Sequence, residues 1–282
     1  QSRRLRIMAV EKLRGREIAQ HKHVFTLKDG RVTAFPQGLP ETPKTRKRWK
    51  ALNDLSGRPS TGHKDLDALI GGLERGGILA LQVDARVPDG YVDLLLFGLI
   101  ANFIRKQRGV AYVPPRKVAA DDVRNALKRY VGVAALDRFI RVFEAAPLGT
   151  LESSAAALQM EGADVETDLR WSTIQYHLGD AGSPVLSLLA FDTLEAVYGP
   201  EVASRLTGHL AAIRKSKDVF VGLASADSPS AEALANLASV HLRIENVEGS
   251  ILLYGEKPYT SFHSISYDVE RGFPQARLLP VV

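Results

Sequence analysis

GILALQVDARVPDGYVDLLLFGLIANFIRKQRGVAYV, residues 77–113, is the stretch that decides the fold. It opens with an apolar run at 78–83, passes through turn residues at 84–90, and continues in a long apolar segment before a second apolar run at 110–113. Two short apolar runs around a segment of helical length predict a strand, a crossover helix and a second, parallel strand. The stretch therefore predicts an α/β fold.

The same alternation of strand and helix continues from Thr61 onward. We predict strands at 78–83, 110–113, 139–143, 185–191, 218–224 and 239–244, and helices at 64–71, 91–106, 119–130, 151–160, 200–215 and 230–237. Such alternation favours a mainly parallel sheet with helices on both faces. Beyond Asn246, short alternating runs at 251–254, 262–267 and 276–279 predict an antiparallel β extension at the C-terminus.

The first 40 residues are β-rich and repeat the order of that tail. Runs at 5–12, 23–27 and 32–36 match tail runs at 251–257, 263–267 and 276–280. A repeated order predicts a repeated structural unit, although two unrelated β-meanders remain the alternative.

If the tail closes one domain, the head is expected to close a preceding one, and Gln1 in place of Met agrees with a chain that extends upstream. We therefore divide the sequence into a β-rich segment at 1–40, a basic linker at 41–60 and a main domain at 61–282.

Composition excludes several classes of site. With 282 residues, 45% of them hydrophobic, the chain can bury a full core. The absence of cysteine excludes disulfides, thiolate metal sites and a cysteine nucleophile, and the seven histidines show no zinc-type spacing, so no metal is expected. No run of about 18 apolar residues and no signal peptide is present, which favours a cytoplasmic protein without membrane contact.

The net charge of +5 is concentrated near the N-terminus, where Arg46, Lys47, Arg48 and Trp49 form a basic cluster with one aromatic residue. Such a cluster can follow a phosphate backbone while the aromatic ring stacks on a base. A solvated linker is the alternative, because charge runs are common in linkers.

Two motifs resemble the KaiC-like branch of the RecA-type P-loop ATPases. Thr61-Gly62, Leu66-Asp67 and Gly71-Gly72 stand before the first strand, as in that branch. The apolar run at 185–191 ends in Asp192, which occupies the place of the residue that positions magnesium. The resemblance covers 61–282 and implies a RecA-like sheet.

The phosphate loop departs from that family. A working loop reads Gly-x-x-x-x-Gly-Lys-Ser/Thr, so that backbone N–H groups and the lysine hold the phosphates and the hydroxyl binds magnesium. In the best register only Gly90 remains, while Tyr91 replaces the lysine and Val92 the hydroxyl. Asp89 and Asp93 add negative charge where a polyphosphate would lie.

The rest of the nucleotide site is also altered. Pro88 removes one N–H donor, and residues 112–117 offer no carboxylate where the family has a glutamate that activates water. Arg86, Gly90 and Asp192 are the candidates for a residual nucleotide site, with Arg86 the only compensating cation. Otherwise Asp192 is a helix N-cap or a turn residue.

Lys12 and Arg14 on the head match the Lys-x-Arg element that KaiC-like domains extend into the ATP site of a neighbouring subunit. They are candidates for such a trans-acting finger that serves an upstream domain. Two exposed basic residues on a strand are the alternative.

We therefore expect a non-catalytic KaiC/RecA-like domain that serves oligomerisation and regulation, as the C-terminal half of a two-domain protein. No cofactor is expected, and ATP with magnesium would bind only if the altered site still functions. The expected partners are identical subunits in a ring or dimer and a regulatory protein. Alternatives are a recombinase-like paralog that binds DNA through its basic linker and an ATPase with an atypical pocket. Residues 148–180 either cover the old nucleotide pocket or form a partner surface.

Overall fold

The computed structural model describes residues 3–12, 14–15, 17–18, 20–35, 38–39, 49–145, 157–179, 181–270 and 272–282. The main domain contains strands β4 (Ile78–Val83), β5 (Arg108–Val113), β6 (Ile140–Ala145), β7 (Ala157–Met160), β8 (Gly182–Ala190), β9 (Val219–Ser225), β10 (Val240–Val247), β11 (Ser250–Lys257), β12 (His263–Glu270) and β13 (Phe273–Pro280). Its helices are α1 (Lys64–Ile70), α2 (Asp89–Arg105), α3 (Ala120–Val131), α4 (Val133–Phe139), α5 (Val165–Asp168), α6 (Trp171–Leu178), α7 (Phe191–Tyr198), α8 (Val202–Arg205), α9 (Thr207–Ser216) and α10 (Ser230–Leu237).

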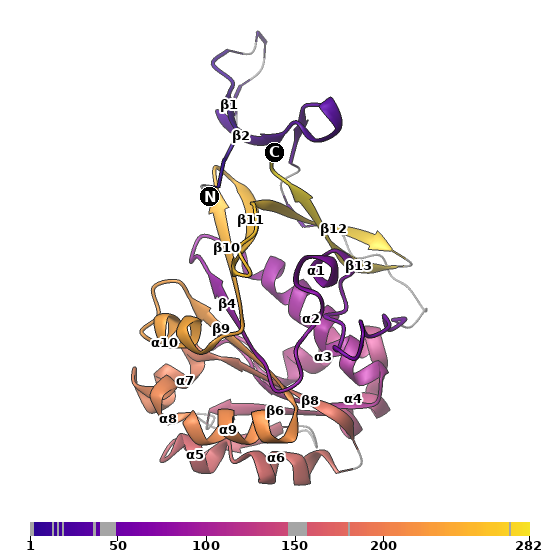
Figure 1. Ribbon diagram of the computed structural model, residues 1–282, viewed down its shortest axis with the longest axis vertical. Coiled ribbons are helices and arrows are strands. Elements are labelled where there is room, and N and C mark those ends of the chain that lie inside the picture. The colour runs from indigo at the N-terminus through magenta and orange to yellow at the C-terminus, as the bar shows by residue number, and fades with distance from the viewer. Residues whose placement is uncertain are drawn as a thin grey trace.

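The ten strands form one sheet in the order β13-β12-β11-β10-β4-β9-β8-β5-β6-β7. Neighbouring strands from β10 to β7 are parallel, whereas β10 to β13 pair antiparallel as the C-terminal extension. The expected mainly parallel sheet with an antiparallel extension is confirmed (Figure 1).

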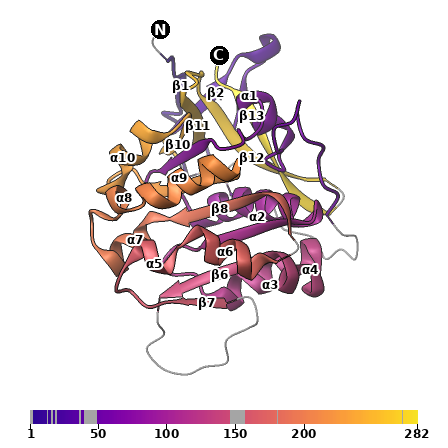
Figure 2. The same cartoon turned by 60° about the horizontal axis from the view of Figure 1, so that its bottom comes forward.

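Helices cover both faces of the sheet (Figures 1 and 2). On β4, Leu79 and Leu81 pack with α2, α3 and α4 in one hydrophobic cluster, while Ile78 and Ala80 pack with α6, α7 and α9 in another. Because side chains alternate between the two faces, the sequence of a strand that is buried on both faces is one continuous apolar run. This is the physical reason that the strand at 78–83 was visible in the sequence. None of the helices in the described ranges has the length and apolarity needed to cross a bilayer.

The helix predicted at 151–160 is wrong over its described part. Residues 157–160 form β7, which pairs in parallel with β6 from Val142↔Ala157 to Ala145↔Met160, and 151–156 lie outside the described residues. The unpaired edge of β6 offers this segment backbone hydrogen bonds that no local pattern reveals. The helix predicted at 200–215 is also interrupted, since α8 ends at Arg205 and α9 begins at Thr207.

The head forms a separate three-stranded sheet from β1 (Ile7–Ala9), β2 (Lys22–Thr26) and β3 (Thr33–Ala34). It packs on the tail of the main domain, where Val24 and Phe35 meet Leu252 and Val281. The Leu27 N–H donates to the carbonyl of Val282 at 3.1 Å. Figure 1 shows the head beside the C-terminus and the β10–β11 hairpin.

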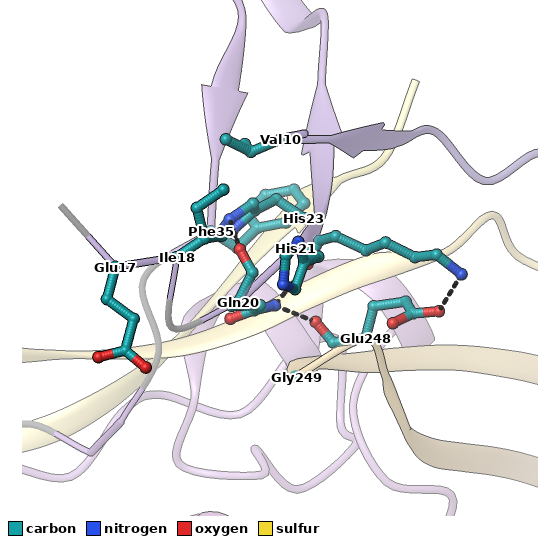
Figure 3. A pocket seen from close by; sticks show the side chains of 10 residues that line it. Val10, Glu17, Ile18, Gln20, His21, His23, Phe35, Glu248 and Gly249 are labelled. Carbon is teal, nitrogen blue, oxygen red and sulfur yellow. Dashed lines mark hydrogen bonds and ion pairs between the residues drawn. The ribbon is translucent and has the colours of Figure 1, made fainter. Parts of the chain in front are cut away.

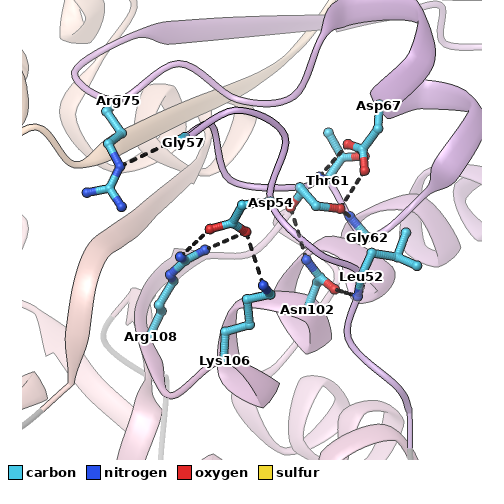
Figure 4. A network of polar contacts seen from close by, with 11 residues as sticks. Leu52, Asp54, Gly57, Thr61, Gly62, Asp67, Arg75, Asn102, Lys106 and Arg108 are labelled. Carbon is cyan, nitrogen blue, oxygen red and sulfur yellow. Dashed lines mark hydrogen bonds and ion pairs between the residues drawn. The ribbon is translucent and has the colours of Figure 1, made fainter.

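Residues 49–60, within the expected linker, are packed against α2 and β5 (Figure 4). Arg108 donates to both carboxylate oxygens of Asp54, at 3.1 and 2.5 Å, and Lys106 lies 3.4 Å from the same group. Asn102 accepts a hydrogen bond from the Leu52 N–H at 2.8 Å. Residues 49–60 therefore pack with the main domain.

Candidate functional site

The crevice expected to bind ligands lies at the carboxyl ends of β4 and β9. From β4 the chain crosses to β5 on one side, and from β9 it crosses to β10 on the other side. Open α/β sheets bind ligands at such a switch point. The loop at 84–88, which joins β4 to α2, lies at this edge of the sheet.

The loop at 84–88 is closed: the Arg86 side chain and several backbone N–H groups of the loop donate hydrogen bonds to other groups of the protein. The Arg86 N–H and Nε donate to Asp84 Oδ1 at 2.8 and 3.0 Å, and Arg86 Nη2 donates to Oδ2 at 2.8 Å. The Val87 N–H donates to the Asp84 carbonyl at 2.9 Å, and the Asp84 N–H donates to the carbonyl of Ile244 at 2.9 Å. These three N–H groups are therefore used by the protein itself and do not face a phosphate.

Arg86, the expected compensating cation, pairs with Asp84 while its side chain is 72% exposed. Hydrogen bonds from Arg86 lower the pKa of Asp84 to about 2, so the carboxylate stays charged at neutral pH. Asn246 Nδ2 also donates to the Arg86 carbonyl at 2.9 Å, which anchors the loop to the end of β10.

The start of α2 is covered by Gly38 and Leu39. A Cβ on Gly90 would lie 2.3 Å from Leu39 Cδ1, so the leucine side chain occupies the space beside this glycine. Tyr91, at the position of the missing lysine, is 4% exposed, and its hydroxyl donates to the Gly38 carbonyl at 3.0 Å. Tyr91 therefore packs inward and holds the covering segment.

Carboxyl groups lie close together near the start of α2. Burial, and then the nearby Asp89, raise the pKa of Asp93 to about 6. Burial, followed by the charges of Asp93 and Asp192, raises the pKa of Tyr112, which is 1% exposed. The carboxyl groups of Asp89 and Asp93 thus place negative charge at the start of α2.

Asp192 has a structural partner. It lies in the first turn of α7, and its Oδ2 accepts a hydrogen bond from the Arg116 N–H at 3.2 Å. The N-cap of α7 is Ala190 and Asp192 lies inside the helix, so it is neither the N-cap nor a turn residue. Thr193 Oγ1 donates to the Pro114 carbonyl at 2.6 Å beside it. Both contacts tie the loop after β5 to α7.

A cavity of about 460 Å³ opens beside this loop, at the carboxyl ends of β5 and β6. Its rim carries Arg116 and Lys117, both exposed, and its floor includes Phe143. Glu144, which the sequence reasoning missed, accepts from the Ala120 N–H and thereby caps α3. The carboxylate in this cavity is thus committed to a backbone donor.

Trp49 is 2% exposed and packs against Tyr130 and Phe273, with ring centroids 5.7 and 5.9 Å apart. The Trp49 ring is therefore not available to stack on a base, because it is packed against aromatic side chains of α3 and β13. Arg46, Lys47 and Arg48 lie outside the described residues. Lys12 and Arg14 lie beyond β1 on the head, are exposed, and are not joined by the structure to Arg86, Gly90 or Asp192.

Another cavity, of about 880 Å³, lies between the head and the β10–β11 turn (Figure 3). Gln20 and Lys22 reach Glu248 across it, the latter pair at 3.4 Å, and His21 and His23 lie on its wall. Within the described ranges no group of three or more carboxylate, imidazole or thiol side chains could hold a metal ion. This cavity is the seam between the head and the main domain.

We expect Asp93→Asn to stabilise the protein at pH 7.5. The folded-state pKa is raised from 3.8 to about 6, so the folded state binds more protons between these values and the charged carboxylate destabilises it fully above pH 6. Allowing for partial solvent exposure, the gain in free energy of unfolding is about 1 kcal/mol. Urea unfolding measures it.

The gain from Asp93→Asn should vanish at pH 4, where the natural carboxyl group is neutral in the folded protein. Glu74→Gln at an exposed position outside α2 is the control and should change stability little. A gain that persists at pH 4 would show that charge burial is not its cause.

The order and direction of the strands define the fold class, a mainly parallel RecA-like α/β sheet with an antiparallel extension. A solved KaiC-like protein from Pyrococcus horikoshii OT3 superposes with a TM-score of 0.55 and 11% identity, covering 78% of this chain and 98% of that one. At this identity the likeness shows the fold alone.

Comparisons of the sequence find one matching family model and two similar proteins. A family model described as GvpD basic region 2 matches residues 48–168. Protein GvpD2 of Halobacterium salinarum is 28% identical over 292 residues, covering 98% of this chain and 58% of that protein. Protein GvpD1 of the same organism is 22% identical over 335 residues, covering 98% of this chain and 62% of that protein. The chain thus spans about three-fifths of the length of these curated relatives.

Proposed function

We propose that the domain from Trp49 to Val282 is a non-catalytic KaiC/RecA-like module that serves regulation and oligomerisation within a longer protein. The observation that carries the proposal is the closed loop between β4 and α2, in which Asp84 takes the N–H and guanidinium donors of Arg86. A loop that has satisfied its own donors gains little from a phosphate.

Three further features support the loss of nucleotide binding. Tyr91 faces Gly38 rather than solvent, Leu39 fills the space beside Gly90, and Asp93 is a half-buried carboxylate. Each missing charge-assisted hydrogen bond removes about 1.5–3 kcal/mol of binding free energy. Together these losses move ATP affinity beyond the millimolar range.

The proposal also includes an additional domain in the longer protein. The curated relatives are longer than this chain, which agrees with an additional domain that would carry any ATPase activity. The head would then connect that domain to this one, and Lys12 and Arg14 would belong to the site of the added domain. Identical subunits and a regulatory protein are the proposed partners.

Titration calorimetry with ATP and ADP in the presence of magnesium tests the proposal. We expect no binding heat up to millimolar nucleotide, and light scattering is expected to give a mass above the 30.8 kDa of one chain, unchanged by nucleotide. Micromolar binding that Arg86→Ala or Asp192→Ala abolishes would instead establish an atypical ATP pocket.

DNA binding gains no support from Trp49, whose ring is buried. Salt-dependent binding to single-stranded DNA that disappears on replacing Arg46, Lys47 and Arg48 by alanine would nevertheless restore the recombinase-like alternative.

A further inference from the structure

The loop between β11 and β12 forms a socket that holds the guanidinium of Arg3. Arg3 Cζ lies 4.3 Å from the ring centroid of Tyr254 and 4.2 Å from that of Tyr259. Both distances are well within the range of cation–π attraction. The Arg3 side chain is only 14% exposed although it lies four residues before β1, near the start of the chain.

The polar contacts of Arg3 follow the fork of a guanidinium. Its Nη1 and Nη2 donate to the two oxygens of Glu256, at 3.2 and 3.1 Å. Nη2 also donates to the Gly255 carbonyl at 2.7 Å, and Nε donates to the Thr260 carbonyl at 2.9 Å. A lysine ammonium has neither the planar face for two rings nor donors spaced for this set of acceptors.

The main domain builds the socket without help from the head. The Gly255 N–H donates to Thr260 Oγ1 at 2.7 Å, and the Thr260 N–H donates back to the Gly255 carbonyl at 2.9 Å. A Cβ on Gly255 would lie 2.4 Å from the Pro258 carbonyl oxygen, so only glycine permits this tight loop. Tyr254 is 4% exposed and its hydroxyl is held by Glu245, which fixes the inner ring.

Other contacts also join the head to the main domain: Thr26 Oγ1 donates to the Pro280 carbonyl at 2.8 Å, and the Leu27 N–H donates to the Val282 carbonyl at 3.1 Å. The Lys22–Glu248 pair is exposed, and such pairs contribute little. The apolar contact with the tail has four fully buried members, Val24, Phe35, Leu252 and Val281. Arg3 is one of several anchors of the head, and it holds the segment before β1.

We propose that this socket is a guanidinium-binding site, selective for arginine over lysine, through which the segment before β1 docks on the main domain. Its ligand class is an arginine side chain presented by an extended segment, here Arg3 itself. The proposal does not depend on the state of the nucleotide site.

Amide hydrogen exchange of β2 in the full chain tests the docking role. Arg3→Ala and Arg3→Lys are both expected to speed exchange of the β2 amides at least tenfold, since each removes the bidentate pair and the stacking. Arg4→Ala removes the same charge from the exposed neighbouring residue and should leave β2 unchanged. Full protection in Arg3→Lys would overturn arginine selectivity, and full protection in Arg3→Ala would overturn the docking role.

A binding experiment on the vacated socket tests the ligand class. N-acetyl-arginine amide, titrated into Arg3→Ala, is expected to shift the Tyr259 ring resonances with saturation in the millimolar range, whereas N-acetyl-lysine amide should not. Adding Glu256→Gln to Arg3→Ala should weaken the arginine response at least tenfold. Equal responses to both amides, or no response to either, would refute the proposed site.

Discussion

Gly62→Ala is expected to lower the free energy of unfolding by about 3–5 kcal/mol, the largest effect of any single substitution considered for this protein. Gly62 has φ +82°, and a Cβ there would lie 2.4 Å from the carbonyl oxygen of Gly98 in α2. A backbone atom inside a buried helix cannot move away as a side chain would. The substitution must therefore push the loop at 60–63 off α2.

Moving the loop at 60–63 would also break hydrogen bonds between buried polar groups. Its next residue, His63, is fully buried, and its Nε2 lies 3.0 Å from the Leu95 carbonyl, while its Nδ1 lies 3.1 Å from the Ala276 N–H. Asp67 accepts from the Thr61 N–H at 2.7 Å in the same loop. Displacing Gly62 would leave these buried polar groups unpaired.

Gly57→Ala is the matched control. Gly57 has a similar φ of +85°, but a Cβ there would meet nothing within 4 Å. The control should therefore show the backbone strain alone, about 1 kcal/mol. Thermal and urea unfolding of both variants measure the difference, and equal losses would show that the close approach to α2 carries no energy.

Acidification from pH 6.5 toward pH 4 is expected to remove up to about 3 kcal/mol of stability for each of two buried histidines. Burial lowers the pKa of His63 and that of His209 from 6.5 to about 4. The unfolded chain binds more protons than the folded protein between these values, so the free energy of unfolding rises with pH. The contribution is complete above pH 6.5 and is lost as the pH falls to 4.

The contacts of each ring explain why it stays neutral. His209 Nδ1 lies 2.8 Å from the Leu169 carbonyl, and its Nε2 lies 3.0 Å from Ser187 Oγ. At His63 the Ala276 N–H points at Nδ1, so this nitrogen must be unprotonated to accept it. Protonation would therefore break one hydrogen bond and bury an unpaired charge.

Urea unfolding at steps from pH 7.5 to pH 4.5 measures this dependence. Asp93 opposes it because its folded-state pKa is raised, so Asp93→Asn is the suitable background. In that background, His209→Gln should reduce the pH dependence of the free energy of unfolding by the contribution of one buried histidine. His177→Gln, at an exposed position, is the control and should leave that dependence unchanged. An unchanged slope in His209→Gln would contradict the assignment.

The sequence was sufficient for the fold class because its evidence is local. The apolar run at 78–83 and the helix-length segment after it have the right lengths and spacing whatever they pack against, and the glycine motif at 61–62 marks a close backbone approach. The interpretation of this loop as an altered phosphate loop, with Tyr91 and Val92 at the required positions, also comes from the sequence and stays a prediction.

What the sequence could not reveal depends on residues far apart in the chain. The strand at 157–160 exists because β6 has a free edge, and Trp49 is buried because Tyr130 and Phe273 surround it. Arg3 meets Glu256 across 253 positions. The sequence by itself determined the mainly parallel sheet, since this follows from periodicity and residue type. Only the tertiary structure decided the closed loop, the buried tryptophan and the arginine socket, because hydrogen bonds and ring contacts require atoms that folding brings together.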